Sequence, residues 1–172
     1  VVCLLNRTYY DLKRHQEFSG KNMQYSDQLL NEKYFPYIIE TSAGLNRMLL
    51  TILCDSYWND ADNNRIVMKL HPTLAPIKAV VCQLVKKDGL PEIGNKIVDE
   101  LMKNFKVLYD QQGSIGKRYY RQDEAGTPFC ITVDHESKEN NTVTLRNRDD
   151  QNQDRVPIND LGKIIQNRMD IL

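Results

Sequence analysis

Residues 40–47 read Glu-Thr-Ser-Ala-Gly-Leu-Asn-Arg and combine groups that bind charged ligands. A short apolar run at 37–39 ends at this segment and a helical pattern follows it, so free backbone N–H groups are expected at the junction. Arg47 lies about one turn into the predicted helix, where its guanidinium can donate two parallel hydrogen bonds to a phosphate. Glu40 offers a carboxylate to an ammonium group. The pattern suits a zwitterionic or charged substrate; the alternative is a capped surface helix with a solvated Arg and Glu.

The basic residues of the chain are unevenly distributed. The 172 residues carry 23 Lys and Arg against 23 Asp and Glu, so the formal net charge is zero. Residues 103–121 nevertheless hold five basic residues and one acidic residue, a local charge of +4, whereas residues 134–154 hold six acidic and three basic residues, a local charge of −3. Any contact with a nucleic acid must therefore come from a local patch and not from overall charge.

The basic segment is predicted to form a helix that ends near Ala125. Arg118 and Arg121 are three residues apart and are therefore expected on one helical face, with Tyr119 and Tyr120 beside them. Arginines bind phosphates and tyrosines stack on unpaired bases, which suits a single-stranded RNA loop. The alternative is a solvated basic helix whose arginines pair with nearby carboxylates.

Composition and cysteine spacing limit the class of protein. With 41% hydrophobic and 27% charged residues, the chain is expected to fold, and no apolar run approaches the length of about 20 residues that a membrane span needs. The four cysteines are far apart and form no CxxC pair, which predicts reduced, buried thiols in a cytosolic protein. The three histidines are equally scattered, so no metal site is expected.

Two regions with different patterns must position the candidate residues. Residues 1–35 are polar and aromatic and show no long periodic element; a helical pattern then runs from Leu45 to near Trp58, followed by a polar connector at 59–64. From about residue 74 the pattern predicts an α/β domain. The elements expected there are a buried strand at 77–85, a helix from Pro91, a strand at 106–109, the basic helix, a hairpin of strands 129–133 and 143–145 around a turn at 135–141, and a last helix from Pro157.

Motifs of one family occur in order through nearly the whole chain. They occupy residues 6–8, 10–12, 15–16, 19–21, 36–40, 42–47, 70–72, 74–78, 113–119, 121–124 and 126–130. On these stretches the sequence resembles glycyl-tRNA synthetases of the dimeric class II type, although Thr41 and Asn46 stand where that family usually has proline and aspartate.

The resemblance implies a division into domains. Residues 1–62 would be the C-terminal part of an antiparallel class II catalytic domain that ends in its third signature motif, and residues 63–73 would be a linker. Residues 74–172 would be an anticodon-binding domain with a mixed, mostly parallel β-sheet flanked by helices.

The resemblance also implies roles for the candidate residues. Glu40 would hold the glycine ammonium group, Ser42 would orient the amino acid, and Arg47 would act as the catalytic residue that contacts the ATP γ-phosphate. Pro36 and Gly44 would complete the substrate pocket, whose small residues exclude larger amino acids by overlap. The residues expected to contact the anticodon arm are Tyr109, Lys117, Arg118 and Arg121.

The implied function is that of a glycine–tRNA ligase. The full-length enzyme, a cytoplasmic homodimer without membrane contact, would activate glycine with ATP and Mg²⁺ and transfer it to tRNA(Gly). The family's first two signature motifs have no counterpart in these residues, so this fragment is expected to be inactive alone and to hold no cofactor or metal. A non-catalytic, synthetase-like accessory subunit of a nucleic-acid enzyme is the alternative.

Overall fold

A computed structural model describes residues 2–170, which divide into two compact units with their boundary between Thr51 and Ile52. The first unit contains β1 (Val2–Thr8), α1 (Tyr10–Ser19), β2 (Tyr25–Asp27), β3 (Glu32–Tyr34), β4 (Ile38–Ala43) and the first residues of α2 (Leu45–Ser56). β1 and β4 form an antiparallel pair, and β2 and β3 form another. Among the described residues, no helix combines the length and apolar character that crossing a membrane requires.

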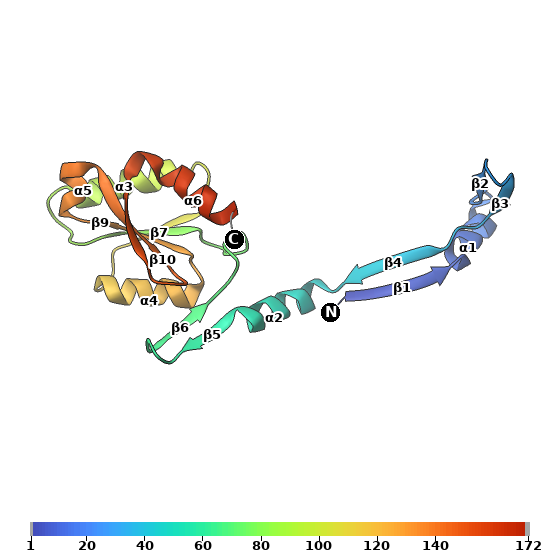
Figure 1. The fold of residues 1–172 in the computed structure, drawn as a ribbon, viewed down its shortest axis with the longest axis horizontal. Coiled ribbons are helices and arrows are strands. Elements are labelled where there is room, and N and C mark those ends of the chain that lie inside the picture. Colours follow the sequence, from blue (N-terminus) through green and yellow to red (C-terminus); the bar gives the residue numbers. More distant parts are fainter. Residues whose placement is uncertain (1, 171–172) are drawn as a thin grey trace. The chain divides into compact units, whose positions relative to one another are not determined.

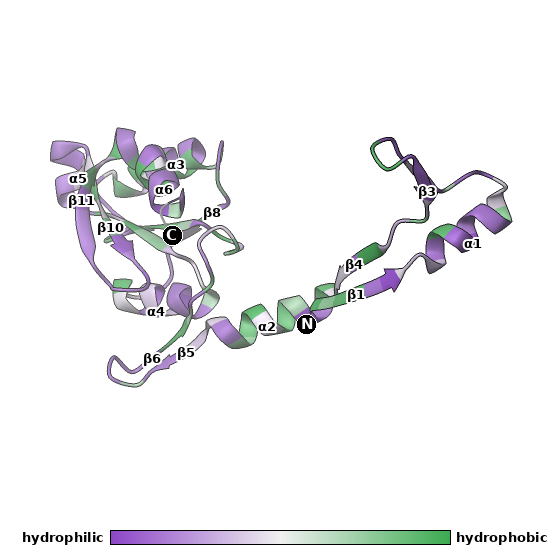
Figure 2. Cartoon of the chain, turned by 45° about the vertical axis from the view of Figure 1, so that its right-hand side comes forward, coloured by the Kyte–Doolittle hydropathy of each residue, from purple (hydrophilic) through white to green (hydrophobic). Residues whose placement is uncertain are grey.

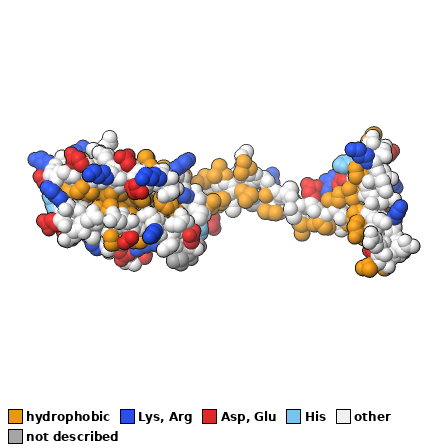
Figure 3. All heavy atoms as spheres, turned by 90° about the horizontal axis from the view of Figure 1, so that it is seen from above, with side chains coloured by type: hydrophobic (Ala, Val, Ile, Leu, Met, Phe, Trp, Pro, Cys, Tyr) orange, Lys and Arg blue, Asp and Glu red, His pale blue; other side chains and the backbone are white. Residues whose placement is uncertain are grey.

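The first unit has no buried core of its own. None of residues 2–51 is buried, and apolar side chains such as Val2, Leu4 and Leu49 are exposed. Figure 2 shows α2 as mostly hydrophobic, and Figure 3 shows hydrophobic side chains on its surface. Helix α1 was not expected from the sequence, because its residues are almost all polar and give no apolar period.

The second unit carries the rest of the secondary structure. After the end of α2 it contains β5 (Tyr57–Asp60), β6 (Arg65–Met68), β7 (Ala79–Gln83), α3 (Leu90–Leu101), β8 (Val107–Asp110), α4 (Ile115–Ala125), β9 (Phe129–Val133), α5 (His135–Asn140), β10 (Thr142–Asn147), β11 (Gln153–Pro157), the short η1 (Ile158–Asp160) and α6 (Leu161–Asp170). Five of the strands form one sheet, in the order β11-β10-β9-β7-β8. β7 pairs in parallel with β8 and β9, whereas β10 is antiparallel to β9 and β11. The predicted mixed α/β fold is confirmed.

The sheet lies between two layers of helices. Figure 1 shows α4 on one face and α3 and α6 on the other. The central strand β7 is buried on both faces: Val80 and Cys82 face α4, while Ala79 and Val81 belong to the larger core beneath α3 and α6. This position explains why the sequence reads as a continuous apolar run, since a strand covered on both sides needs no polar alternation.

Several local predictions were wrong. The residues expected as a connector at 59–64 are the end of β5 and the turn of its hairpin with β6, and α2 ends at Ser56 instead of near Trp58. The expected turn at 135–141 is helix α5, which begins with a capping box between Asp134 and Ser137. Strand β11 was also missed; it is an exposed edge strand with little apolar pattern.

The cysteines are only partly as expected. Cys82 and Cys130 are buried, but Cys3 and Cys54 are exposed, and all four are free. Burial raises the pKa of the Cys82 thiol to about 11 and raises that of Cys130 further. The apolar residues next to Cys3 and Cys54 in the sequence, Val2, Leu4 and Leu53, are themselves exposed.

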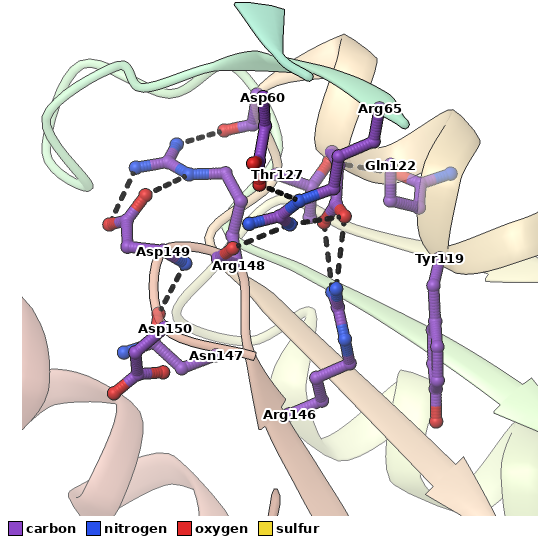
Figure 4. A network of polar contacts seen from close by, with 12 residues as sticks. Asp60, Arg65, Tyr119, Gln122, Thr127, Arg146, Asn147, Arg148, Asp149 and Asp150 are labelled. Atoms are coloured by element: carbon purple, nitrogen blue, oxygen red, sulfur yellow. Dashed lines mark hydrogen bonds and ion pairs between the residues drawn. The ribbon is translucent and has the colours of Figure 1, made fainter. Parts of the chain in front are cut away.

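A buried ionic network fixes α4 against its neighbours (Figure 4). The carboxylate of Asp123, fully buried on α4, pairs with Arg65 and with Arg146, each at 2.8 Å. Arg65 also pairs with Asp60 at 2.8 Å, and the Arg146 guanidinium lies 4.8 Å from the centre of the Tyr119 ring. The network joins the β5–β6 hairpin, α4 and β10, and so determines which face of α4 points toward solvent.

Candidate nucleic-acid interface and candidate substrate pocket

The carboxyl ends of β7 and β8 are the natural place for a ligand in the second unit. After β7 the chain continues to α3 on one face of the sheet, and after β8 it continues to α4 on the other face. Ligands of open α/β sheets bind where neighbouring strands diverge in this way. Two exposed segments leave the sheet at this point, residues 84–89 and residues 112–114.

Arg118, which was expected to contact RNA, is an internal residue. Its exposed fraction is 4%, and its guanidinium donates to the backbone oxygen of Gln83 at 2.7 Å and to that of Gly113 at 2.7 and 3.1 Å. The expectation of a direct phosphate contact is therefore corrected, because the donors of this side chain are used on backbone carbonyls. Arg118 instead joins the end of β7 to the loop that precedes α4.

The outer face of α4 keeps the other expected residues accessible. Lys117, Tyr120 and Arg121 follow a spacing of three and four residues and are all exposed. Arg121 pairs with Asp110 at 2.6 Å and donates to the oxygen of Gln112 at 3.0 Å, so it lies against the β8–α4 loop. Burial acts to raise the pKa of Asp110, but hydrogen bonds from the Gln112 N–H and from Arg121 outweigh it and lower that pKa.

The side chains of Tyr109 and Tyr119 pack against other elements and use their hydroxyl groups in hydrogen bonds within the protein. Tyr109 packs beneath α3, where its hydroxyl donates to the carbonyl oxygen of Pro91 at 3.3 Å. A Cβ added to Gly94 would lie only 2.6 Å from the Tyr109 hydroxyl oxygen. The hydroxyl of Tyr119 hydrogen-bonds with Thr132 at 2.6 Å. Of the tyrosines considered for stacking on bases, Tyr120 therefore has the most accessible ring, at 46% exposed.

Sequence reasoning missed two cations at the same edge of the sheet. Lys86 and Lys87 lie in the exposed segment that follows β7. They lie outside the basic segment at 103–121, and the strand topology brings them to the carboxyl edge of the sheet, where α4, which carries Lys117, also begins. With Arg121 and Tyr120 they form what we call the edge surface: Lys86, Lys87, Lys117, Tyr120 and Arg121.

In the first unit, the expected ammonium-binding residues lie on β4 and not at a turn. Glu40 and Ser42 are two residues apart in this strand and therefore share a face. Glu40 already pairs with a cation, the guanidinium of Arg7 at 3.1 Å, and Arg7 also pairs with Asp11. A hydrogen bond from Arg7 lowers the pKa of Asp11. The carboxylate of Glu40 is thus already placed to accept hydrogen bonds from a positive group.

Arg47 lies on the first turn of α2, directly after the strand. Its side chain runs next to Gly44, where an added Cβ would lie 3.8 Å from the Arg47 side chain, and it makes no ion pair within residues 2–170. Pro36 is partly buried and precedes β4. Residues 2–170 contain no group of three or more His, Cys, Asp or Glu side chains that could hold a metal ion.

The second unit is a mixed α/β domain with exposed cations at one edge of its sheet. Comparison with known proteins identifies the family to which this domain belongs. Residues 78–168, just over half of the chain, match the family model described as "Anticodon binding domain". The chain belongs to this family.

The relatives extend the similarity to nearly the whole chain. The glycine–tRNA ligase of Treponema denticola is 58% identical over 165 residues, which cover 91% of this chain and 36% of the relative. Those of Borrelia hermsii and Geobacillus kaustophilus are 51% and 48% identical, covering 91% and 96% of this chain and 36% of each relative. The resemblance predicted from the motifs is confirmed. The chain spans about a third of the length of these curated relatives.

Proposed function

We propose that this chain is the C-terminal part of a glycine–tRNA ligase and that its second unit binds the anticodon arm of tRNA(Gly). The observation that carries the proposal is the edge surface, which places exposed lysines, Arg121 and Tyr120 where two strands of the sheet diverge. Cations hold the phosphates of an RNA loop, and an exposed tyrosine offers a ring on which an unpaired base can stack. Arg118 acts in this proposal as a positioning residue that holds the loop at 111–114.

The first unit would contribute to the pocket for glycine and ATP. Glu40 and Ser42 share one face of β4, and Arg47 projects from the helix that follows, in an order suited to an ammonium group and then a phosphate. Pro36 and Gly44 would line the same pocket. Because none of residues 2–51 is buried, this unit needs other parts of a catalytic domain to cover its apolar side chains. That need supports assigning the first unit to such a domain. The bounds proposed from the resemblance, 1–62 for this domain and 63–73 for a linker, would place the two paired strands β5 and β6 on different sides of the boundary.

The full-length enzyme would use ATP with Mg²⁺, act as a homodimer and work in the cytoplasm. The glycine carboxylate would attack the α-phosphate of ATP to form glycyl-adenylate, a mixed anhydride, with pyrophosphate as the leaving group, while Arg47 would hold the γ-phosphate. The names of the relatives favour this function over a non-catalytic accessory subunit.

The binding proposal is tested by measuring the affinity of the chain for tRNA(Gly) at several salt concentrations. We expect a linear fall of log K with log salt and a preference for tRNA(Gly) over a tRNA with a different anticodon. An affinity that does not respond to salt, or equal affinity for both tRNAs, would contradict the proposal.

The catalytic proposal needs the full-length protein that contains these residues. Glycine-dependent exchange of pyrophosphate into ATP should be present, and Arg47→Ala should reduce it by about a hundredfold or more, as expected when a charge-stabilising donor is lost. Alanine and serine should not support exchange. Unchanged exchange in the Arg47 variant would remove Arg47 from the proposed site.

A further inference from the structure

The side chain of Gln83, the last residue of β7, is buried without any hydrogen-bond partner. Its exposed fraction is 1%, and both its amide nitrogen and its amide oxygen lack partners. A buried amide normally finds partners, because leaving donors and acceptors unpaired in the interior is costly. An unpaired amide at the end of a strand therefore calls for an explanation that involves a ligand.

Gln83 lies at the carboxyl end of β7, the edge at which ligands of open α/β sheets bind. It pairs with Val133 on β9, whose side chain belongs to the core beneath α3, so the amide lies on that face. Tyr109 lies on the same face of the neighbouring strand, where it pairs with Val81, two residues before Gln83. The Arg118 guanidinium holds the Gln83 backbone by donating to its carbonyl oxygen at 2.7 Å. The amide is thus fixed at the carboxyl edge of the sheet, next to the exposed segment 84–89.

We propose that Gln83 reads one unstacked base of the anticodon loop, an inference that rests on the proposed tRNA-binding function. A glutamine amide pairs one donor with one acceptor. Adenine and cytosine present an amino donor beside a ring-nitrogen acceptor on their Watson–Crick edges, whereas guanine and uracil present a ring N–H donor beside a carbonyl acceptor, so an amide held in one orientation distinguishes these two classes of base. Because both amide atoms are buried, segment 84–89 would move aside to let the base reach the amide and form two hydrogen bonds with it. The edge surface then provides affinity through phosphates, and Gln83 provides selectivity at one position.

A second buried glutamine supplies a matched control. Gln122 has an exposed fraction of 5%, and its amide oxygen accepts a hydrogen bond from the Thr127 hydroxyl at 2.7 Å. The same substitution should therefore have opposite effects at the two sites. Gln122→Leu leaves a buried hydroxyl without its acceptor and should lower Tm, whereas Gln83→Leu removes only unpaired groups and should leave Tm unchanged or raise it.

The experiment measures the affinity of the full chain for tRNA(Gly) and for transcripts in which each anticodon base is changed in turn, at one fixed salt concentration. We expect the unmodified chain to prefer the natural base at one position by about tenfold or more, as for a two-hydrogen-bond contact to a base edge. Gln83→Leu should lose the preference at that position alone. Gln122→Leu should keep the preference, and Gln83→Met serves as a second variant if Gln83→Leu does not fold.

The outcomes separate this inference from the proposed function. If the unmodified chain binds tRNA(Gly) with base preference and the Gln83 variants keep that preference, the reading role is wrong while the binding function stands. A fall of Tm in Gln83→Leu comparable to that in Gln122→Leu, with preference retained, would show that the amide has a structural role only. If the unmodified chain does not bind tRNA at all, the proposed function fails and this inference fails with it.

Discussion

Arg118 and Arg121 lie three residues apart on α4, yet their guanidinium groups have different surroundings. That of Arg118 donates to carbonyl oxygens inside the protein, whereas the Arg121 side chain is 47% exposed and pairs with Asp110. One helical turn therefore carries one arginine that holds a loop and one that faces solvent. Mutating each should affect different properties of the protein.

Arg118→Ala should destabilise the second unit by about 3 kcal/mol, because hydrogen bonds from a charged donor to the buried carbonyl of Gln83 and the partly buried carbonyl of Gly113 are lost. Arg118→Lys should recover only part of this loss, since an ammonium group cannot reproduce the fork of a guanidinium. Urea unfolding of the full chain measures both variants. A loss below about 0.5 kcal/mol for Arg118→Ala would contradict the positioning role.

Lys117→Ala and Arg121→Ala should instead weaken RNA binding without a large change in stability. Each variant removes one cation from the edge surface, so the slope of log K against log salt should become shallower by about one unit. The loss of affinity should be similar for all anticodon sequences, because phosphate contacts carry no base information. Lys163→Ala, an exposed lysine on α6, is the control and should change neither slope nor affinity.

Asp123→Asn should be among the most damaging substitutions in the chain. The Asp123 carboxylate pairs with both Arg65 and Arg146. Neutralising it removes the anion that compensates the positive charges of these two buried guanidinium groups. Breaking a buried ion pair in this way costs about 3–5 kcal/mol. Asp62→Asn, in the exposed turn between β5 and β6, should change the unfolding free energy by less than about 0.5 kcal/mol. Equal stability of the two variants would show that the network is not needed.

Stability should fall in acid. Hydrogen bonds from Arg155 lower the pKa of Asp134. A carboxylate whose pKa is lower in the folded state stabilises the fold above the pKa of the unfolded chain, about 4 for aspartate. This contribution is lost as pH falls from about 4 through the lowered folded value. The urea midpoint measured between pH 6 and pH 3 should therefore drop less steeply for Asp134→Asn than for the unmodified chain. An identical drop would exclude Asp134 as a source of this pH dependence.

The sequence predicted the central elements of the second unit because each has a strong local pattern. The apolar run around Val80 and Val81 identified the strand that is buried on both faces, and the four-residue period of Ile93, Ile97 and Leu101 identified α3. The missed elements lack such patterns. Helix α1 is almost entirely polar, and α5 is one short helix whose capping box reads as a polar turn.

The candidate RNA contacts were predicted as a segment but not as individual side chains. The spacing of Arg118 and Arg121 allows one common face, but Ile115 and Tyr119 pack against the sheet and turn Arg118 inward with them. The four-residue spacing of these two apolar residues was the available signal. The positions of Lys86, Lys87 and Gln83 depend on how the strands are ordered in the sheet, which no local pattern reveals.

The most direct test of the central claim maps where the anticodon loop lies on the protein. A tRNA(Gly) transcript with a photoreactive uridine in its anticodon loop is cross-linked to the full chain, and the linked peptides are identified by mass spectrometry. The cross-links should fall in residues 84–89 and 109–124, which surround the carboxyl ends of β7 and β8. Cross-links confined to α6 or to residues 2–51 would contradict the account.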